Sequence, residues 1–308
     1  MLGAMSGVVH DGMPTRRLWR GLLACASISL LAACGGADSA SPSTSVVPTA
    51  LVTPPPIRTT IPSTTLPETT STLSSPSTTT GPAIDTSYGV YTVQPDGSVV
   101  PVPTAQHQVL WDLFRRVLGD AATVRYIESF TVYFDAHRNV DATVLDGQTP
   151  GKRQVSVNSA YADDLAALTR TFIHEYGHII TLAGDQVSTG GGGCGTTAVD
   201  QGCLKPDSYL NGFLDRFWWV YGSEAFDALS SPAANEAFYV AHQSDFVTRY
   251  AATDPLEDIA EVWAEFVIGD APAGATVAEQ KILYLYGFPA LVDLREQIRT
   301  RVGDVIGV

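Results

Sequence analysis

The tract from about residue 37 to residue 85 limits which part of this chain can fold. It is rich in serine, threonine and proline, as in the run STTLPETTSTLSSPSTTT, and has few apolar side chains. Such a composition buries too little apolar surface to offset the entropy lost on ordering the chain. We therefore expect residues 34–85 to form a disordered linker. The single folded domain is expected over residues 86–308, which are long enough for one sizeable core.

The first 34 residues have the layout of an export signal. In PTRRLWRGLLACASISLLAAC, residues 14–34, a basic start is followed by an apolar run of about a dozen residues and then by small residues. That run is too short to span a bilayer. Its end, LAAC, resembles the lipobox of bacterial lipoproteins, which implies cleavage after residue 33 and a lipid on Cys34.

We therefore expect residues 1–33 to be a lipoprotein signal peptide. The mature protein would then lie in the bacterial cell envelope, lipid-anchored on the extracytoplasmic face of the membrane. An ordinary cleaved signal, which gives a secreted protein, is the alternative. Met1 and Met13 are both compatible with the start of translation.

Charge and cysteine content restrict the class of protein further. The net charge is −14 at pH 7, which excludes a nucleic-acid-binding protein because phosphates favour basic surfaces. Once the signal and Cys34 are set aside, Cys194 and Cys203 remain in a chain bound for an oxidising compartment. We predict a disulfide between them. Zinc ligation by this pair is the weaker alternative, because eight intervening residues do not match the spacing of structural zinc sites.

The pattern of apolar residues predicts an α+β domain, with a small mixed sheet followed by a mostly helical C-terminal part. VYTVQPDGSVVPV indicates a hairpin with Asp96-Gly97 at its turn. Further strands are expected at residues 129–134 and 153–159. Helices are expected at residues 105–118, 162–182, 208–220, 255–268, 276–286 and 289–302.

The helix expected at residues 162–182 contains the sequence HEYGH. At 100° per residue, His174 and His178 lie about 40° apart on one face, while apolar residues fill the opposite arc. Two imidazoles one turn apart can bind one metal ion, and Glu175 projects beside them. The pattern indicates a zinc site, although two ligands do not complete one.

The third ligand is expected on the helix at residues 255–268. Glu257 and Glu261 share one face of this mostly apolar helix, which favours Glu257 as the ligand and Glu261 as second choice. A capping box with Asp254 is the alternative explanation of Glu257. Asp185 and His242 are weaker candidates for the third ligand.

Together the two motifs resemble those of the gluzincin metallopeptidases, in particular the catalytic domain of anthrax toxin lethal factor and related bacterial zinc-binding lipoproteins. In that family HExxH is followed by a helix with Glu-x-x-x-Glu, preceded at a fixed interval by a tyrosine. Here YAATDPLEDIAE, residues 250–261, has that arrangement. The resemblance implies a zincin-like fold with one catalytic Zn²⁺ bound by His174, His178 and Glu257.

The resemblance also implies a role for three further residues: Glu175 as general base, Tyr250 as the phenol that stabilises the oxyanion, and Glu261 as the residue that orients a ligating histidine. It suggests that an extended substrate pairs with an edge strand near Val155 and Val157.

The expected function is that of a lipid-anchored, monomeric zinc metalloendopeptidase acting on a peptide or protein substrate. The alternatives are a non-catalytic zinc- or peptide-binding envelope lipoprotein on the same scaffold, and a purely structural envelope protein.

Overall fold

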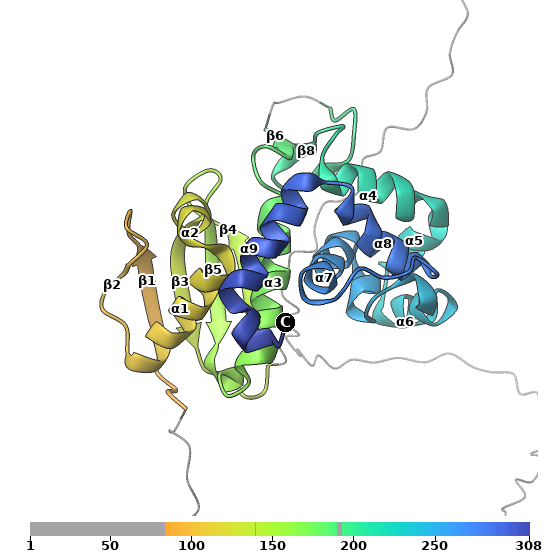
Figure 1. Ribbon diagram of the computed structural model, residues 1–308. Coiled ribbons are helices and arrows are strands. Elements are labelled where there is room, and N and C mark those ends of the chain that lie inside the picture. Colours follow the sequence, from red (N-terminus) through yellow and green to blue (C-terminus); the bar gives the residue numbers. More distant parts are fainter. Residues whose placement is uncertain (1–83, 139, 190–192) are drawn as a thin grey trace, which may run out of the picture. The chain divides into compact units, whose positions relative to one another are not determined.

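The computed structural model describes residues 84–138, 140–189 and 193–308, all of which belong to one structural unit (Figure 1). The expected signal peptide, Cys34 and nearly all of the expected linker lie outside the described residues. Within the described residues, no helix combines the length and apolar character needed to cross a membrane.

A five-stranded mixed sheet forms the N-terminal part of the domain. Its strands are β1 (Gly89–Val93), β2 (Val99–Val100), β3 (Ile127–Tyr133), β4 (Ala142–Asp146) and β5 (Arg153–Asn158). Their order is β2-β1-β3-β5-β4, and β3 and β5 are parallel whereas the other neighbours are antiparallel. A mixed sheet followed by helices confirms the α+β class.

One face of this sheet forms the core with helices α1 (Ala105–Leu118) and α3 (Leu165–Thr181). Alternate residues of β3 and β5 point into it, and Phe130, Val132, Val155 and Val157 are all fully buried. Phe130 contacts Trp111 of α1, with ring centroids 5.1 Å apart. The strands therefore position α3, which carries the candidate site.

The predicted position of the edge strand was wrong. Strand β5, which contains Val155 and Val157, has β3 on one side and β4 on the other. Because both of its neighbours occupy its backbone groups, β5 cannot accept another strand. The edge strand beside α3 is β4, a segment for which the sequence analysis expected no strand.

Helix α7 (Pro255–Ile268) packs against α3, and its two ends are fixed by polar contacts (Figure 1). At its start, Pro255 occupies the first turn and the Asp254 carboxylate accepts a hydrogen bond from the N–H of Leu256 at 2.7 Å. At its end, Arg295 and Arg299 of α9 (Pro289–Ile306) donate to the last carbonyls. The cap thus defines where α7 begins, and the arginines join its last turn to α9.

Helix α2 (Asp120–Tyr126) and the short 3-10 helix η1 (Ser159–Tyr161) belong to the N-terminal part with the sheet. The aromatic-rich C-terminal part also contains α4 (Tyr209–Phe217), α5 (Ser223–Ala228), α6 (Pro232–Ala241) and α8 (Val277–Tyr286), with the short 3-10 helices η2 (Trp219–Tyr221), η3 (Gln243–Asp245) and η4 (Tyr250–Thr253). The helices expected at 105–118, 255–268 and 276–286 are confirmed almost to the residue. Helices α2, α5 and α6 were not expected.

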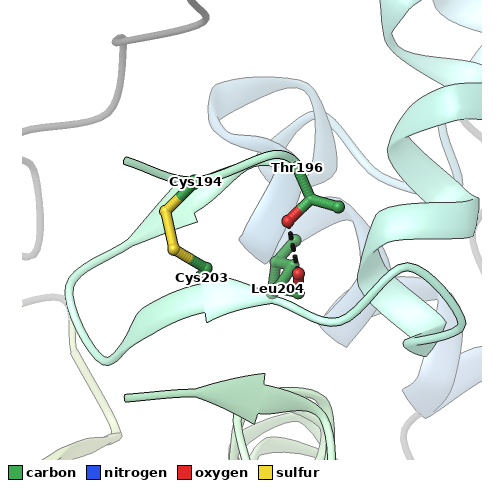
Figure 2. The surroundings of a disulfide bond; sticks show 4 residues. All are labelled: Cys194, Thr196, Cys203 and Leu204. Atoms are coloured by element: carbon green, nitrogen blue, oxygen red, sulfur yellow. Dashed lines mark hydrogen bonds between the residues drawn. A yellow bond between two sulfur atoms is a disulfide. The ribbon is translucent and has the colours of Figure 1, made fainter. Parts of the chain in front are cut away.

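A second, three-stranded sheet follows α3 and carries the disulfide. Its strands are β6 (Val187–Ser188), β7 (Ala198–Val199) and β8 (Gly202–Leu204), in the order β6-β8-β7. Cys194 and Cys203 are bonded, with Cα atoms 5.4 Å apart, and the Thr196 hydroxyl donates to the Leu204 carbonyl beside them (Figure 2). The predicted disulfide is confirmed.

Candidate metal centre

Helix α3 carries the two histidines because its start is capped and most of its surface is apolar. The carboxylate of Asp164 accepts a hydrogen bond from the N–H of Ala167 at 2.9 Å, which satisfies one free donor of the first turn. Phe172, Ile173 and Ile179 are buried in the core. His174 and His178 lie on the other face of α3, which is turned toward α7.

Gly177 allows α3 and α7 to approach closely at this point. A Cβ atom there would lie 3.0 Å from Cδ1 of Trp263 and 3.1 Å from the backbone Cα of Ala260, both on α7. Such separations are shorter than an ordinary carbon–carbon contact. The glycine between the two histidines therefore lets a carboxylate on α7 reach them.

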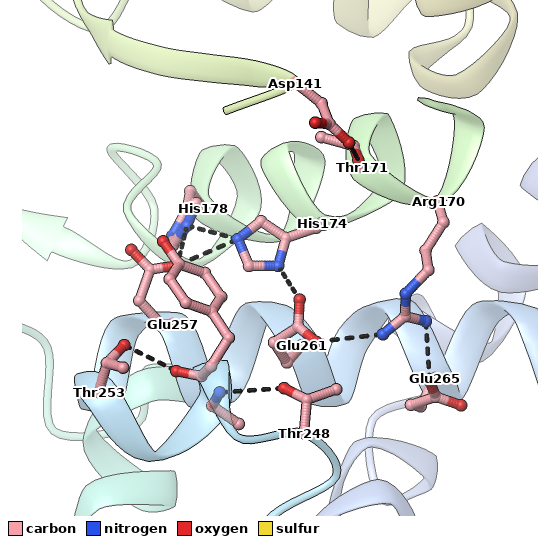
Figure 3. A network of polar contacts seen from close by, with 12 residues as sticks. Asp141, Arg170, Thr171, His174, His178, Thr248, Thr253, Glu257, Glu261 and Glu265 are labelled. Atoms are coloured by element: carbon pink, nitrogen blue, oxygen red, sulfur yellow. Dashed lines mark hydrogen bonds and ion pairs between the residues drawn. The ribbon is translucent and has the colours of Figure 1, made fainter. Parts of the chain in front are cut away.

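That carboxylate is the side chain of Glu257, in the first turn of α7. Its Oε2 atom lies 3.1 Å from Nε2 of His174 and 3.3 Å from Nε2 of His178. The two Nε2 atoms are themselves 3.2 Å apart. Glu257 thus faces the histidines, and Asp254 alone caps the helix, so the capping-box explanation of Glu257 is not what the structure shows (Figure 3).

These three atoms fit the ligand set of a tetrahedral zinc ion. Ligand atoms bound at about 2.0 to 2.1 Å in a tetrahedron are separated by about 3.3 to 3.4 Å. The observed triangle, with sides of 3.1, 3.2 and 3.3 Å, agrees within a few tenths of an ångström. His174, His178 and Glu257 therefore form a group that can hold a metal ion. Two imidazoles and one carboxylate leave a fourth position open.

The electric field at the triangle favours a positive charge. Burial opposes protonation of His174, but the carboxylates of Glu257 and Glu261 outweigh it and raise the pKa of His174 to about 10. Burial likewise opposes ionisation of Glu257, yet the neighbouring imidazoles hold its pKa well below the usual value. The field that stabilises a proton on His174 also stabilises a bound cation.

Glu261 orients His174 from the opposite side of the ring. Its Oε1 atom lies 2.7 Å from Nδ1 of His174, which directs Nε2 toward Glu257. Arg170 then bridges Glu261, at 3.1 Å, and Glu265, at 2.7 Å (Figure 3). Glu261 thus lies next to the three candidate metal ligands and is not one of them.

Glu175 lies on the side of the triangle that faces β4. It is 7% exposed, and the backbone N–H of Val144 in β4 faces its carboxylate. Burial raises the pKa of Glu175, while the two histidines act against that shift. A buried carboxylate with a raised pKa, next to a metal group, is suited to taking up a proton.

Tyr250 lies on the α7 side of the same group, in η4. Its ring centroid is 5.9 Å from that of His174, and the residue is 53% exposed. Burial of the hydroxyl and the nearby carboxylate of Glu257 raise its pKa above the ordinary value, so the hydroxyl keeps its proton. Tyr250 can therefore donate a hydrogen bond beside the metal group.

The structure brings the favoured candidates together and separates the weaker ones from them. Among the described residues, the group able to hold a metal ion contains neither Asp185 nor His242. His242 lies instead between Glu224, at 3.0 Å, and Asp245, at 3.6 Å. Cys194 and Cys203 are bonded to each other and provide no ligand.

Two polar residues near the group were missed by the sequence analysis. Arg170 lies one turn before His174 on α3, so a helical wheel could have found it. Asp141, whose carboxylate is 3.4 Å from the hydroxyl of Thr171, precedes an unpredicted strand and gave no local signal.

No family model, curated protein or solved structure matches this chain.

Proposed function

We propose that this chain is a zinc-dependent metallopeptidase of the gluzincin type, with a zincin-like fold. The observation that carries the proposal is the triangle formed by Nε2 of His174, Nε2 of His178 and Oε2 of Glu257, with the buried carboxylate of Glu175 beside it. Two histidines and one carboxylate with a free fourth position make a ligand set typical of catalytic zinc and not of structural zinc.

The chain's own residues supply the acid–base steps. When bound, zinc acts as a Lewis acid and lowers the pKa of water at the open position to about 7. Glu175 accepts the proton released during attack on a peptide carbonyl and returns it to the leaving amine. Its burial supports this role, because a carboxylate with a raised pKa is a stronger base and holds the proton between the two steps.

Tyr250 and Glu261 complete the proposed machinery. The protonated Tyr250 hydroxyl donates a hydrogen bond to the oxyanion that develops on the carbonyl oxygen. Glu261 holds Nδ1 of His174 and thereby fixes the direction of its Nε2.

We place the peptide substrate along β4. Within the described sheet β4 pairs with β5 on one side only, so its other edge can accept an extended chain. The N–H of Val144 facing Glu175 brings that strand next to the proposed general base.

We also propose that residues 1–33 are a lipoprotein signal peptide and that a lipid on Cys34 anchors the protein in the bacterial cell envelope. The basic, apolar and small-residue order of residues 14–34, ending in LAAC, supports this. Secretion without an anchor is the alternative, and mass spectrometry of the N-terminal peptide distinguishes the two.

Replacing Glu175 with Gln tests the enzymatic role. We expect the wild-type protein to bind one zinc ion and to cleave a randomised synthetic peptide library. The Glu175→Gln protein should keep the zinc and lose cleavage by about a thousandfold, because general-base catalysis contributes on that order. Glu296→Gln, the same change at an exposed position of helix α9, serves as the control and should leave cleavage unchanged.

Zinc binding without cleavage by the wild-type protein would contradict the enzymatic role. It would favour a non-catalytic zinc- or peptide-binding protein on the same scaffold.

A further inference from the structure

A carboxylate that the proposed mechanism does not use lies at the beginning of the edge strand. Asp141 immediately precedes β4, and its Oδ2 atom is 3.4 Å from the hydroxyl of Thr171 on α3 (Figure 3). Thr171 precedes His174 by three residues, so the two side chains lie on the same face of the helix, one turn apart. Asp141 is therefore close to the proposed site and outside its catalytic group.

Two observations indicate the direction of β4 relative to α3. Asp141 contacts Thr171 at one level, and the backbone N–H of Val144 is near enough to Glu175, one helical turn further on, to lower the pKa of its carboxyl. Strand and helix thus run in the same direction. The cleaved bond would lie beside Glu175, level with Val144, and the three residues from Asp141 to Val144 span about 10 Å of strand. A substrate side chain level with Asp141 therefore belongs to a residue two or three positions from the cleaved bond.

Asp141 lacks a cationic partner among the residues that the structure describes. Arg138 directs its guanidinium over the ring of Tyr133, and Arg170 pairs with two glutamates on α7. The Thr171 hydroxyl is a weak partner, because it also faces the Ala167 carbonyl, at 3.3 Å.

The carboxylate is partly buried, and burial raises the pKa of Asp141 above its ordinary value. A partly buried carboxylate without a cation is destabilised, and a positive charge brought by a ligand would relieve this.

We propose that Asp141 selects peptides carrying a lysine or arginine side chain two or three residues from the cleaved bond. The inference rests on the proposed peptidase function and specifies its substrate class. The basic side chain lies over the first half of α3 and pairs with the Asp141 carboxylate, while the backbone of the peptide pairs with β4. The acidic net charge of the chain, −14, acts in the same direction by attracting basic peptides.

Cleavage profiles of a randomised synthetic peptide library test this selection. With the zinc-loaded wild-type protein we expect lysine and arginine to be enriched about fivefold at one position two or three residues from the cut, as for a half-buried ion pair. Asp141→Asn should abolish the enrichment while cleavage continues. Asp141→Lys should reverse it and favour aspartate and glutamate at the same position.

Asp163→Asn is the matched control. It removes one negative charge from an exposed residue just before α3 and should leave the profile unchanged. If Asp141 had a purely structural role, replacing it would lower the cleavage rate for all peptides alike. It would not exchange a preference for basic residues for a preference for acidic ones.

Cleavage by the wild-type protein without enrichment of basic residues would overturn this inference and leave the peptidase function intact. Enrichment that persists in Asp141→Asn would also overturn it. Absence of cleavage of any peptide would overturn both proposals.

Discussion

Gly177 is the residue on which the approach of α3 and α7 depends most directly. We expect Gly177→Ala to destabilise the protein by about 2 kcal/mol and to weaken zinc binding, because the new methyl group would press on the backbone of Ala260 and on Trp263. Thermal unfolding and zinc titration measure the two effects.

Gly184→Ala is the control for this change. Among the described residues, apart from the two that adjoin Gly184 in the chain, no atom lies within 4 Å of a Cβ placed there, so the same substitution should alter neither property. Equal effects of the two substitutions would contradict the close-approach argument.

The extent to which the site could be predicted differs from residue to residue. His174, Glu175 and His178 were predictable because their spacing follows from helix geometry alone. Glu257 was predictable because two carboxylates on one face of a mostly apolar helix require a partner. Asp141 was not, because its place depends on which strand lies at the edge of the sheet, and that order is set by contacts remote in sequence.

At the scale of elements, α7 is held on its far side by a buried ion pair. The ammonium of Lys281 on α8 lies 2.6 Å from Oδ2 of Asp258, and both side chains are fully buried. The indole N–H of Trp218 donates to the same oxygen at 2.8 Å, and the ring of Phe246 lies 3.9 Å from the ammonium. Asp258 follows Glu257 directly, so this pair also fixes the first turn of α7.

We expect Lys281→Met to destabilise the protein by about 3 kcal/mol or more, because it leaves the Asp258 carboxylate buried without a counter-charge. Urea unfolding measures the loss. Adding Asp258→Asn should recover about half of it, since the amide oxygen still accepts from Trp218 and no buried charge remains. Gln280→Met, at the exposed neighbouring position, is the control. A double variant no more stable than Lys281→Met would contradict this explanation.

The elements themselves were predicted unevenly for physical reasons. Helices α1, α7 and α8 each have a cap residue and a long run of apolar residues at helical spacing, so their ends could be predicted from the sequence. Strand β4 is only five residues long and ends in exposed positions, so its pattern was too weak to predict. The resemblance had suggested an edge strand near Val155 and Val157, and without a predicted β4 nothing in the sequence pattern corrected that position.

For the whole molecule, one carboxylate links stability to acid pH. Glu128 on β3 accepts hydrogen bonds from the N–H groups of Gln148 and Thr149 and from the Gln154 amide. Burial acts in the opposite direction, but these bonds lower the pKa of Glu128 from 4.5 to about 2. Because the pKa is lower in the folded state, this stabilisation is complete above about pH 4.5 and is lost as the pH falls toward 2.

We expect Glu128→Gln to lower the free energy of unfolding by about 1 kcal/mol at pH 7. The difference between the two proteins should shrink between pH 4.5 and pH 2. Urea unfolding at a series of pH values measures it, with Glu236→Gln on α6 as a surface control. A difference that stays constant down to pH 2 would contradict the role assigned to these hydrogen bonds.

The central claim is that one zinc ion joins α3 to α7. A crystal structure of the zinc-loaded protein, with anomalous data collected at the zinc edge, tests it most directly. We expect a single strong peak about 2.0 to 2.2 Å from Nε2 of His174, Nε2 of His178 and a carboxylate oxygen of Glu257. Density for zinc elsewhere, or a zinc ion bound by the histidines without Glu257, would contradict the account.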